Sequence, residues 1–301
     1  MRSKPVTLIL LLLPAVIWGF AFVAQVQGME YIGAFTMIGV RFIIGAAVLL
    51  PVILLFERGK SDRAEIKRTV LASLVVGTVL FLASAFQQFG IEMTGSAGVS
   101  GFITGLYTVF IPIVSYLLFK QRTSLSVWLG ALCAVGGLAL LCYHPGQGFR
   151  FGYGELLLLI GAFFWTAHVM VIDRMGKSVR SIRLSAGQFL VCGLWGVLAM
   201  FIFEQPSMGA ILDAKWPVLY CAVMSSGVAY TLQVVAQKRA DPTVAAIVFS
   251  SESMFSAIGG ALFRIDKIAP IGYVGCALMF CGIILSQIKT GKKRVPDPVD
   301  E

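Results

Sequence analysis

The sequence predicts an all-α integral membrane protein whose ten transmembrane helices form two inverted five-helix repeats around a central cavity. Three observations carry this prediction: the composition, the spacing of the apolar runs and an internal repeat. Of the 301 residues, 58% are hydrophobic and only 13% are charged, whereas a soluble globular chain is typically about 45–50% apolar and about 25% charged. This composition excludes an ordinary water-soluble domain.

Apolar runs long enough to cross a bilayer recur along the whole chain. At about 1.5 Å of rise per residue, a helix needs about 20 apolar residues to cross a hydrocarbon core about 30 Å thick. The connectors between these runs are short, so the functional residues are expected in or between the helices. The ten expected spans are Val6–Gln25, Gly33–Phe56, Thr69–Ile91, Ala97–Phe119, Leu125–Tyr143, Gly154–Ile172, Ile182–Phe203, Trp216–Gln237, Val244–Phe263 and Ile268–Ile288.

The basic residues fall mainly in alternate connectors. If both termini are cytoplasmic, 19 of the 24 Lys and Arg residues lie in cytoplasmic segments and 4 in external connectors. Because cytoplasmic loops carry an excess of bases, we expect a multi-pass protein of the inner or plasma membrane with both termini inside. Residues 289–301 are expected to form a disordered cytoplasmic tail. The net charge of +9 is thereby explained by orientation and contact with membrane lipid, and no nucleic-acid partner is predicted.

The chain contains an internal repeat. A shift of 147 positions superposes Trp18 on Trp165, Phe42 on Phe189 and the pair 56–57 on the pair 203–204, all without a gap. A shift of 145 positions then superposes Gln88 on Gln233, Gly130 on Gly275 and Gly137 on Gly282. Matches of Trp, Gln and Glu are harder to obtain by chance than matches of common apolar residues, so we interpret the pattern as a duplication.

Each half of the chain then holds five helices. Because five is odd, the second copy enters the membrane in the opposite direction to the first. Inverted repeats of this kind build many secondary transporters, with the binding site near the midplane. The expected domains are residues 1–143 and residues 152–288.

The spans carry diffuse motifs that resemble one known family. The sequence is similar to the drug/metabolite transporter superfamily, specifically its EamA-type ten-helix members, over residues 5–288. The resemblance implies two five-helix halves around a central cavity and movement of small organic solutes by alternating access. The segments that carry it are AVIWGFAFVAQ, MIGVRFIIGAAVL, FITGLYTVFIPIVSYLLF, WLGALCAVGGLALL, SSESMFSAIGGALF and GYVGCALMFCGIIL.

One connector departs from the family pattern. Family members often carry a Gly-Glu pair after the ninth helix, whereas this chain has RIDKIAP there. The acid is displaced to Asp266, so the resemblance assigns that carboxylate no role.

Two ionisable residues lie deep in the expected spans. Arg41 and Glu252 each lie about 12 Å from the start of their helices, and charges at such depth are costly and usually face a cavity or a partner. Their counterparts in the repeat are Gln188 and Tyr107. Arg41 is a candidate either for bracing the bundle or for facing substrate. Glu252 is a candidate for binding a substrate ammonium group, for exchanging a proton or for pairing with Arg41.

Five further residues complete the candidate substrate-binding or coupling set. His168 is interpreted either as a packing residue or as a proton relay. Trp18 and Trp165 lie inside their helix ends, which favours cavity lining over membership of an interfacial aromatic belt. Gln88 and Gln233 are candidates either for packing between helices or for lining two gates.

Other residues are assigned to packing. Gly101 and Gly105 form a GxxxG pattern, which predicts close helix packing, and Pro112 is a candidate hinge. The cysteines lie inside expected spans without metal-ligand or disulfide spacing, so we expect neither a metal site nor a cofactor.

The sequence lacks the patterns of other functional classes. It contains no HExxH motif, no P-loop and no external domain, so neither an enzyme nor a primary pump is predicted. The hypothesis is a secondary transporter that exports small metabolites, most simply amino acids or related zwitterions. Protons are a candidate coupling ion, and both a monomer and a homodimer are compatible with the sequence. The alternatives are a non-transporting membrane sensor and a facilitative channel-like permease for another small solute.

Overall fold

The structure, a computed structural model, describes residues 4–59, 62–120, 124–144, 146, 148–149, 151–237, 248–249, 251–266 and 268–287. The tail expected over residues 289–301 and the start of the ninth expected span, residues 244–247, lie outside the described residues.

The described part of the chain is a bundle of apolar helices, which confirms the predicted all-α membrane class. Six helices are long and apolar enough to cross a membrane, and two shorter apolar helices accompany them. The six are α1 (Lys4–Gly28), α2 (Ala34–Phe56), α3 (Arg63–Thr94), the consecutive pair α4 (Ala97–Gly105) and α5 (Tyr107–Phe119), α7 (Tyr153–Met175) and α8 (Ser181–Phe203); the two shorter ones are α6 (Leu125–Leu141) and α14 (Pro270–Gln287).

The remaining elements are short. A short hairpin connects α6 to α7, and its two strands, β1 and β2, have two residues each and pair antiparallel. Their bounds and those of the short helices are β1 (Tyr143–His144), β2 (Gly148–Phe149), η1 (Gly176–Ser178), α9 (Met208–Asp213), α10 (Lys215–Leu219), η2 (Tyr220–Ala229), α11 (Tyr230–Gln237) and α13 (Glu252–Leu262).

Three of the expected spans are not uniform α-helices. The fourth is interrupted at Leu106, which forms a turn between α4 and α5. The ninth has a turn at Ser251, immediately before α13 begins. The eighth runs through α10, η2 and α11, and η2 is a π-helix. π-helical turns are rare in proteins as a whole, but they occur often at functional sites. The π-helix η2 therefore directs attention to the part of the bundle that it lines.

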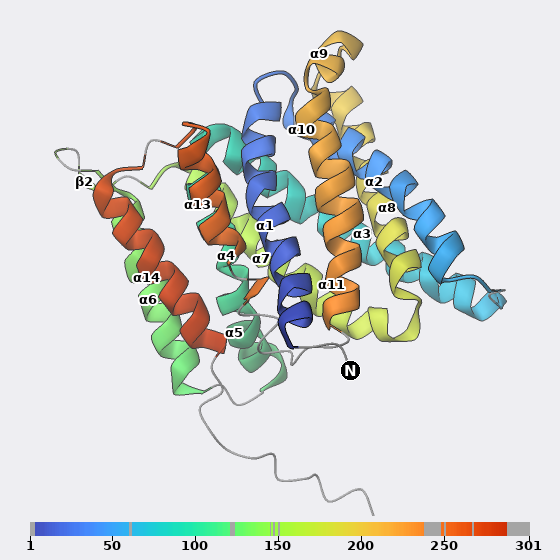
Figure 1. Cartoon of the computed structure of the whole chain (residues 1–301), viewed down its shortest axis with the longest axis horizontal. Coiled ribbons are helices and arrows are strands. Elements are labelled where there is room, and N and C mark those ends of the chain that lie inside the picture. The colour runs from blue at the N-terminus through green and yellow to red at the C-terminus, as the bar shows by residue number, and fades with distance from the viewer. Residues whose placement is uncertain are drawn as a thin grey trace, which may run out of the picture.

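The helices pack in a single bundle with one peripheral pair (Figure 1). Helix α6 packs along α14, α3 packs against both α7 and α8, and α2 packs against α8. Helix α1 contacts α13 and η2, and α4 packs on α13. In Figure 1 the start of α1 lies at the lower face, called here the N-terminal face, whereas β2 and α9 lie at the upper face, called the hairpin face.

Two carboxylates hold the starts of α2 and α8. Glu57, which follows α2, accepts hydrogen bonds from the N–H groups of the second and third residues of α8 at 2.9 and 3.0 Å. Glu204, which follows α8, accepts hydrogen bonds from the second and third N–H groups of α2, both at 2.8 Å. These N–H groups have no intrahelical partner and lie at the positive end of the helix dipole. The residue that follows each of these two helices therefore caps the start of the other helix.

Two pairs of glycines bring α6 and α14 into backbone contact. A Cβ atom on Gly130 would lie 2.5 Å from the carbonyl oxygen of Gly282, and one on Gly137 would lie 2.5 Å from that of Gly275. Only glycine permits this approach, because any side chain would overlap the facing backbone.

Helices α4 and α13 close the bundle at the hairpin face. Gly101 and Gly105 face serines of α13, and Ser253 Oγ donates a hydrogen bond to the Gly101 carbonyl at 3.0 Å. The close packing predicted from the GxxxG pattern is confirmed. The helix breaks directly after Gly105, while Pro112, the expected hinge, lies within α5.

Asp266, which follows α13, caps the start of α4. Its carboxylate accepts hydrogen bonds from Ser96 Oγ and from the N–H groups of Ala97 and Gly98 at 2.8, 2.8 and 2.9 Å. Burial raises the pKa of this carboxyl, and the three hydrogen bonds act in the opposite direction. The displaced acid thus ties the α13–α14 connection to α4 at the hairpin face.

Candidate functional site

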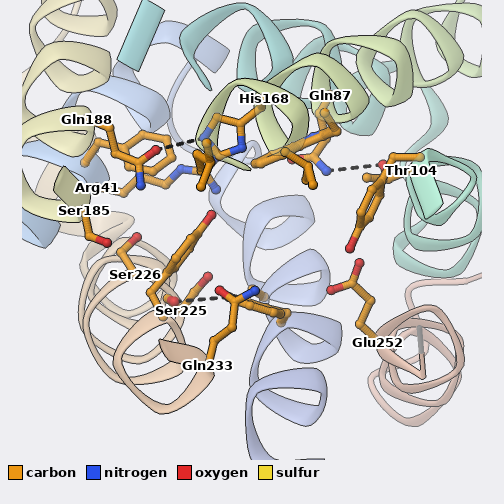
Figure 2. A pocket seen from close by; sticks show the side chains of 18 of the residues that line it. Arg41, Gln87, Thr104, His168, Ser185, Gln188, Ser225, Ser226, Gln233 and Glu252 are labelled. Atoms are coloured by element: carbon orange, nitrogen blue, oxygen red, sulfur yellow. Dashed lines mark hydrogen bonds between the residues drawn. The ribbon is translucent and has the colours of Figure 1, made fainter. Parts of the chain in front are cut away.

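A cavity of about 640 Å³, with both polar and apolar side chains in its wall, lies in the centre of the bundle (Figure 2). Its walls come from α1, α2, α3, α4, α5, α7, η1, α8, η2, α11 and α13. Eight of the nine residues selected from the sequence line it: Trp18, Arg41, Tyr107, Trp165, His168, Gln188, Gln233 and Glu252.

Arg41 is buried in the wall formed by α2. Its side chain is 6% exposed, and its Nη1 donates a hydrogen bond to Gln25 Oε1 at 2.6 Å. Gln25 is itself fixed, because its Nε2 donates to the Ala21 carbonyl at 3.0 Å. The guanidinium carbon lies 4.7 Å from the centre of the Phe42 ring, a cation–π distance. Arg41 is therefore held in place while it faces the cavity.

Glu252 faces the cavity from α13. It is 8% exposed and is the first residue of its helix, where the helix dipole favours a negative charge. Within the described residues it accepts no hydrogen bond and forms no ion pair, and Tyr107 and Tyr230 line the same cavity. Figure 2 shows Arg41 and Glu252 on opposite sides of the cavity. The pairing of Arg41 with Glu252, one alternative left open by the sequence, is absent from the structure.

His168, Gln188 and Trp165 form one polar corner of the cavity. His168 Nε2 and Gln188 Oε1 lie 2.8 Å apart in a hydrogen bond, drawn as a dashed line in Figure 2. If His168 is neutral, this bond assigns its proton to Nε2. The Trp165 ring meets the His168 ring edge to face, with centroids 5.4 Å apart. The corner joins α7 to α8 across the cavity wall.

Trp18 anchors α1 to the π-helix. Its indole N–H donates a hydrogen bond to the Ser225 carbonyl at 3.2 Å, and its ring meets the Tyr230 ring edge to face at 5.3 Å. Gln233 lies one turn beyond Tyr230 and also faces the cavity. The cavity-lining interpretation of Trp18 therefore agrees with its position.

Gln88 is the one selected residue that lies outside the cavity wall. It is fully buried, whereas its neighbour Gln87 lines the cavity and donates a hydrogen bond to Thr104 Oγ1 at 3.2 Å. Adjacent residues of a helix point about 100° apart. The repeat match drew attention to the correct helical turn but to the wrong one of two glutamines for cavity lining.

Sequence reasoning missed several other lining residues. Gln25 had a usable signal, because it is a polar side chain at the end of the first apolar run. Ser225 and Ser226 lie in a polar pair within the eighth run, but only the π-helix decides that both line the cavity. No local signal distinguishes Gln87 from Gln88.

The cavity extends toward the N-terminal face. Asp173, Ser181 and Ser185, which lie near the junction of α7 and α8, line that end. At the hairpin face α4 packs on α13 and Asp266 caps α4. Within the described residues, the cavity therefore reaches toward the N-terminal face, with tight helix packing toward the hairpin face.

The chain is similar in sequence to a family of known transporters. The model of the EamA-like transporter family matches residues 5–143 and again residues 152–287. An uncharacterized transporter of Archaeoglobus fulgidus is 27% identical over 287 residues, which cover 93% of this chain and 85% of that protein. Solute carrier family 35 member B1 of Xenopus tropicalis is 24% identical over 273 residues, which cover 83% of this chain and 80% of that protein.

A solved crystal structure shares the fold. It superposes with a TM-score of 0.68 at 19% identity, covering 94% of this chain and 97% of that chain. The family and these relatives are transporters rather than enzymes. Because the family model matches nearly the whole chain, the protein belongs to the EamA-like transporter family of the drug/metabolite transporter superfamily and is a multi-pass membrane protein.

Proposed function

We propose that the protein is a secondary transporter that exports amino acids or related zwitterionic metabolites by alternating access. The observation that carries this proposal is the pair of opposite charges, Arg41 and Glu252, which face one cavity without pairing. Arg41 suits a carboxylate and Glu252 suits an ammonium group. The volume of about 640 Å³ falls in the range of about 300–1,000 Å³ that is usual for small-molecule sites.

The proposal includes a ten-helix inverted repeat, with one copy over residues 1–143 and the other over residues 152–288. A two-fold axis requires that contacts between the copies occur in crossed pairs. The reciprocal caps by Glu57 and Glu204, which are repeat counterparts, have this property. So do the crossed glycine contacts of α6 with α14. Phe42 and Phe189, also counterparts, meet each other with ring centroids 5.5 Å apart, as residues on the axis would.

The proposed orientation places both termini in the cytoplasm of a cell bounded by an inner or plasma membrane. The excess of bases in the connectors of the N-terminal face supports it. In this orientation the cavity is open to the cytoplasm, so the described conformation is the one in which an exporter takes up its substrate. Protons are the proposed coupling ion, and Glu252 and His168, two of the ionisable groups that line the cavity, are the proposed carriers. The proposal holds equally for a monomer and a homodimer.

Counterflow into liposomes tests the proposal. The purified protein is reconstituted and loaded with unlabelled solute, and uptake of labelled L-amino acids and of ω-amino acids of increasing length is measured. We expect uptake of at least one zwitterion above that of empty liposomes. Steady binding of a solute without flux of any member of the panel would instead support the membrane-sensor alternative.

A further inference from the structure

Two buried N–H groups, each on a residue that lines the cavity, have no acceptor among the residues that the structure describes. They are Nε of Arg41 and Nε1 of Trp165, and both atoms are buried. Buried N–H groups nearly always have a hydrogen-bond partner, and leaving one without a partner costs about 1–3 kcal/mol. Two such donors in the wall of one cavity are complementary to a ligand that brings its own acceptor oxygens.

The two donors belong to the same wall of the cavity. The Arg41 guanidinium lies 4.7 Å from the centre of the Phe42 ring, and that ring packs on the ring of Phe189 of α8, the chain neighbour of Gln188, with centroids 5.5 Å apart. Gln188 is hydrogen-bonded to His168 at 2.8 Å, and the His168 ring packs on the Trp165 ring. This series of contacts connects Arg41 to Trp165 along the surface of α8. Glu252 lies on the opposite side (Figure 2).

The hydrogen bond that Arg41 donates engages Nη1 and leaves Nε without an acceptor among the described residues. Gln25 accepts the hydrogen bond of Nη1 at 2.6 Å, and Gln25 is in turn held by the Ala21 carbonyl. The Cys221 thiol also interacts with Arg41, but sulfur is a weak acceptor. The Nε edge therefore remains for a strong acceptor, and a guanidinium edge fits a carboxylate in a bidentate manner.

We propose that the Nε edge of Arg41 and the indole N–H of Trp165 bind the carboxylate of the substrate, and that Gln25 is the residue that positions Arg41. This inference rests on the proposed transport of zwitterions, because it assigns one end of the substrate to one wall of that cavity. It makes carboxylates the preferred ligand class and predicts that neutral amides of the same solutes bind poorly.

Binding and transport are measured separately on the full chain. Calorimetric titration of the purified protein in detergent uses the twenty L-amino acids and the amide of each. We expect the wild type to bind its best amino acid at least about tenfold more tightly than the amide, because a hydrogen bond to a charged group is lost. Counterflow in liposomes is measured with the same compounds.

Three variants test the residues. Trp165→Phe removes the N–H group while keeping an aromatic ring, and Gln25→Met removes the acceptor that holds Arg41. In both variants we expect the affinity for the amino acid to fall about tenfold and the affinity for the amide to remain unchanged. The matched control is Trp195→Phe, because Trp195 is exposed and donates to Thr78 Oγ1 away from the cavity; it is expected to keep both affinities. A merely structural role of Gln25 would change both affinities together.

Each outcome separates the two proposals. Selective binding of amino acids that is lost in Trp165→Phe, together with no flux in counterflow, would refute transport and support the carboxylate site. Flux with equal affinity for amino acids and amides would support transport and overturn the carboxylate site. Absence of binding by all twenty amino acids would also overturn it. Unchanged melting temperatures in detergent establish that the variants are folded.

Discussion

A guanidinium at the depth of Arg41 remains tolerable only if protein groups replace the water that it has lost. Gln25 supplies an acceptor at 2.6 Å and the Phe42 ring supplies a polarisable face. The sequence left bracing and substrate binding as alternatives for this residue. The structure separates them by atom, since Nη1 is engaged by Gln25 while Nε has no partner among the described residues.

Glu252 is the residue for which a single charge is expected to matter most. Glu252→Gln keeps the shape of the side chain and removes its ability to exchange a proton or to attract an ammonium group. We expect the rate of counterflow, or its dependence on pH, to change by about tenfold or more, because an intramembrane carboxyl without a partner is retained for function. Counterflow measured between pH 5.5 and 8.5 checks this.

The control for this variant is Glu30→Gln at an exposed position between α1 and α2. It loses the same charge outside the cavity and is expected to leave the rate and its pH profile unchanged. A wild-type rate and pH profile in Glu252→Gln would remove Glu252 from the mechanism.

At the scale of elements, the carboxylates at helix ends connect segments that are far apart in the sequence. Glu57, Glu204 and Asp266 each follow one helix and cap the start of another. Such caps satisfy N–H groups that would otherwise be buried without partners. They also fix the relative height of the two helices, because a carboxylate must lie within hydrogen-bond distance of a helix start.

Glu204→Gln is expected to destabilise the protein. The carboxylate accepts hydrogen bonds from two N–H groups of α2 and from Thr36 Oγ1, and an amide group can retain only part of this set. The expected loss is about 2 kcal/mol of unfolding free energy, in the range for helix caps. The measurement is the apparent melting temperature in detergent, with Glu30→Gln as the reference that removes an exposed charge. Equal melting temperatures for the two variants would show that the cap adds nothing.

Gly137→Ala tests the contact between α6 and α14. Its new Cβ would lie 2.5 Å from the Gly275 carbonyl oxygen, so the helices must separate, at an expected cost of about 1–3 kcal/mol. The adjacent Gly136→Ala is the control, since its Cβ would meet only a Leu278 methyl at 3.6 Å. Both substitutions gain the same helix propensity. We expect a lower melting temperature for Gly137→Ala alone, and similar values for both would contradict the packing argument.

At the scale of the whole molecule, the described residues combine a cavity that reaches toward the N-terminal face with tight helix packing at the hairpin face. Helices α4 and α13 pack on each other toward one end, and the cavity continues to the junction of α7 and α8 at the other. The proposed alternating access requires that the contacts at the hairpin face open while the N-terminal face closes. The breaks at Leu106 and Ser251 lie where each of the two helices could change direction.

Accessibility to a membrane-impermeant maleimide tests this orientation. In a variant without native cysteines, Ser185→Cys at the N-terminal end of the cavity is expected to react in inside-out vesicles and to remain unlabelled in intact cells. Tyr153→Cys at the hairpin face, where the native side chain is 78% exposed, is expected to show the opposite pattern. Labelling of Ser185→Cys from outside would contradict the proposed inward opening.

The candidate site was largely predictable from the sequence, and the reason is physical. Depth in a helix and the cost of burying charge are local properties, so Arg41 and Glu252 could be singled out without a structure. The repeat then supplied Trp18, Trp165 and Gln233 as further candidates. The choice between Gln87 and Gln88 could not be made in this way, because it depends on the rotation of α3 about its axis, which packing against α7 and α8 decides.

The sequence by itself determined that the chain crosses a membrane, and it predicted how the bases distribute between the two sides and which residues of the two halves correspond. Apolar runs, charge and periodicity act over one helix or one connector, and each can be read from neighbouring residues. Only the tertiary structure decided that Arg41 engages Gln25 instead of Glu252, that the eighth span contains a π-helix and that Gln87 lines the cavity while Gln88 does not. These features depend on how distant helices fit together, because a buried polar group takes whichever partner the packing brings within hydrogen-bond distance.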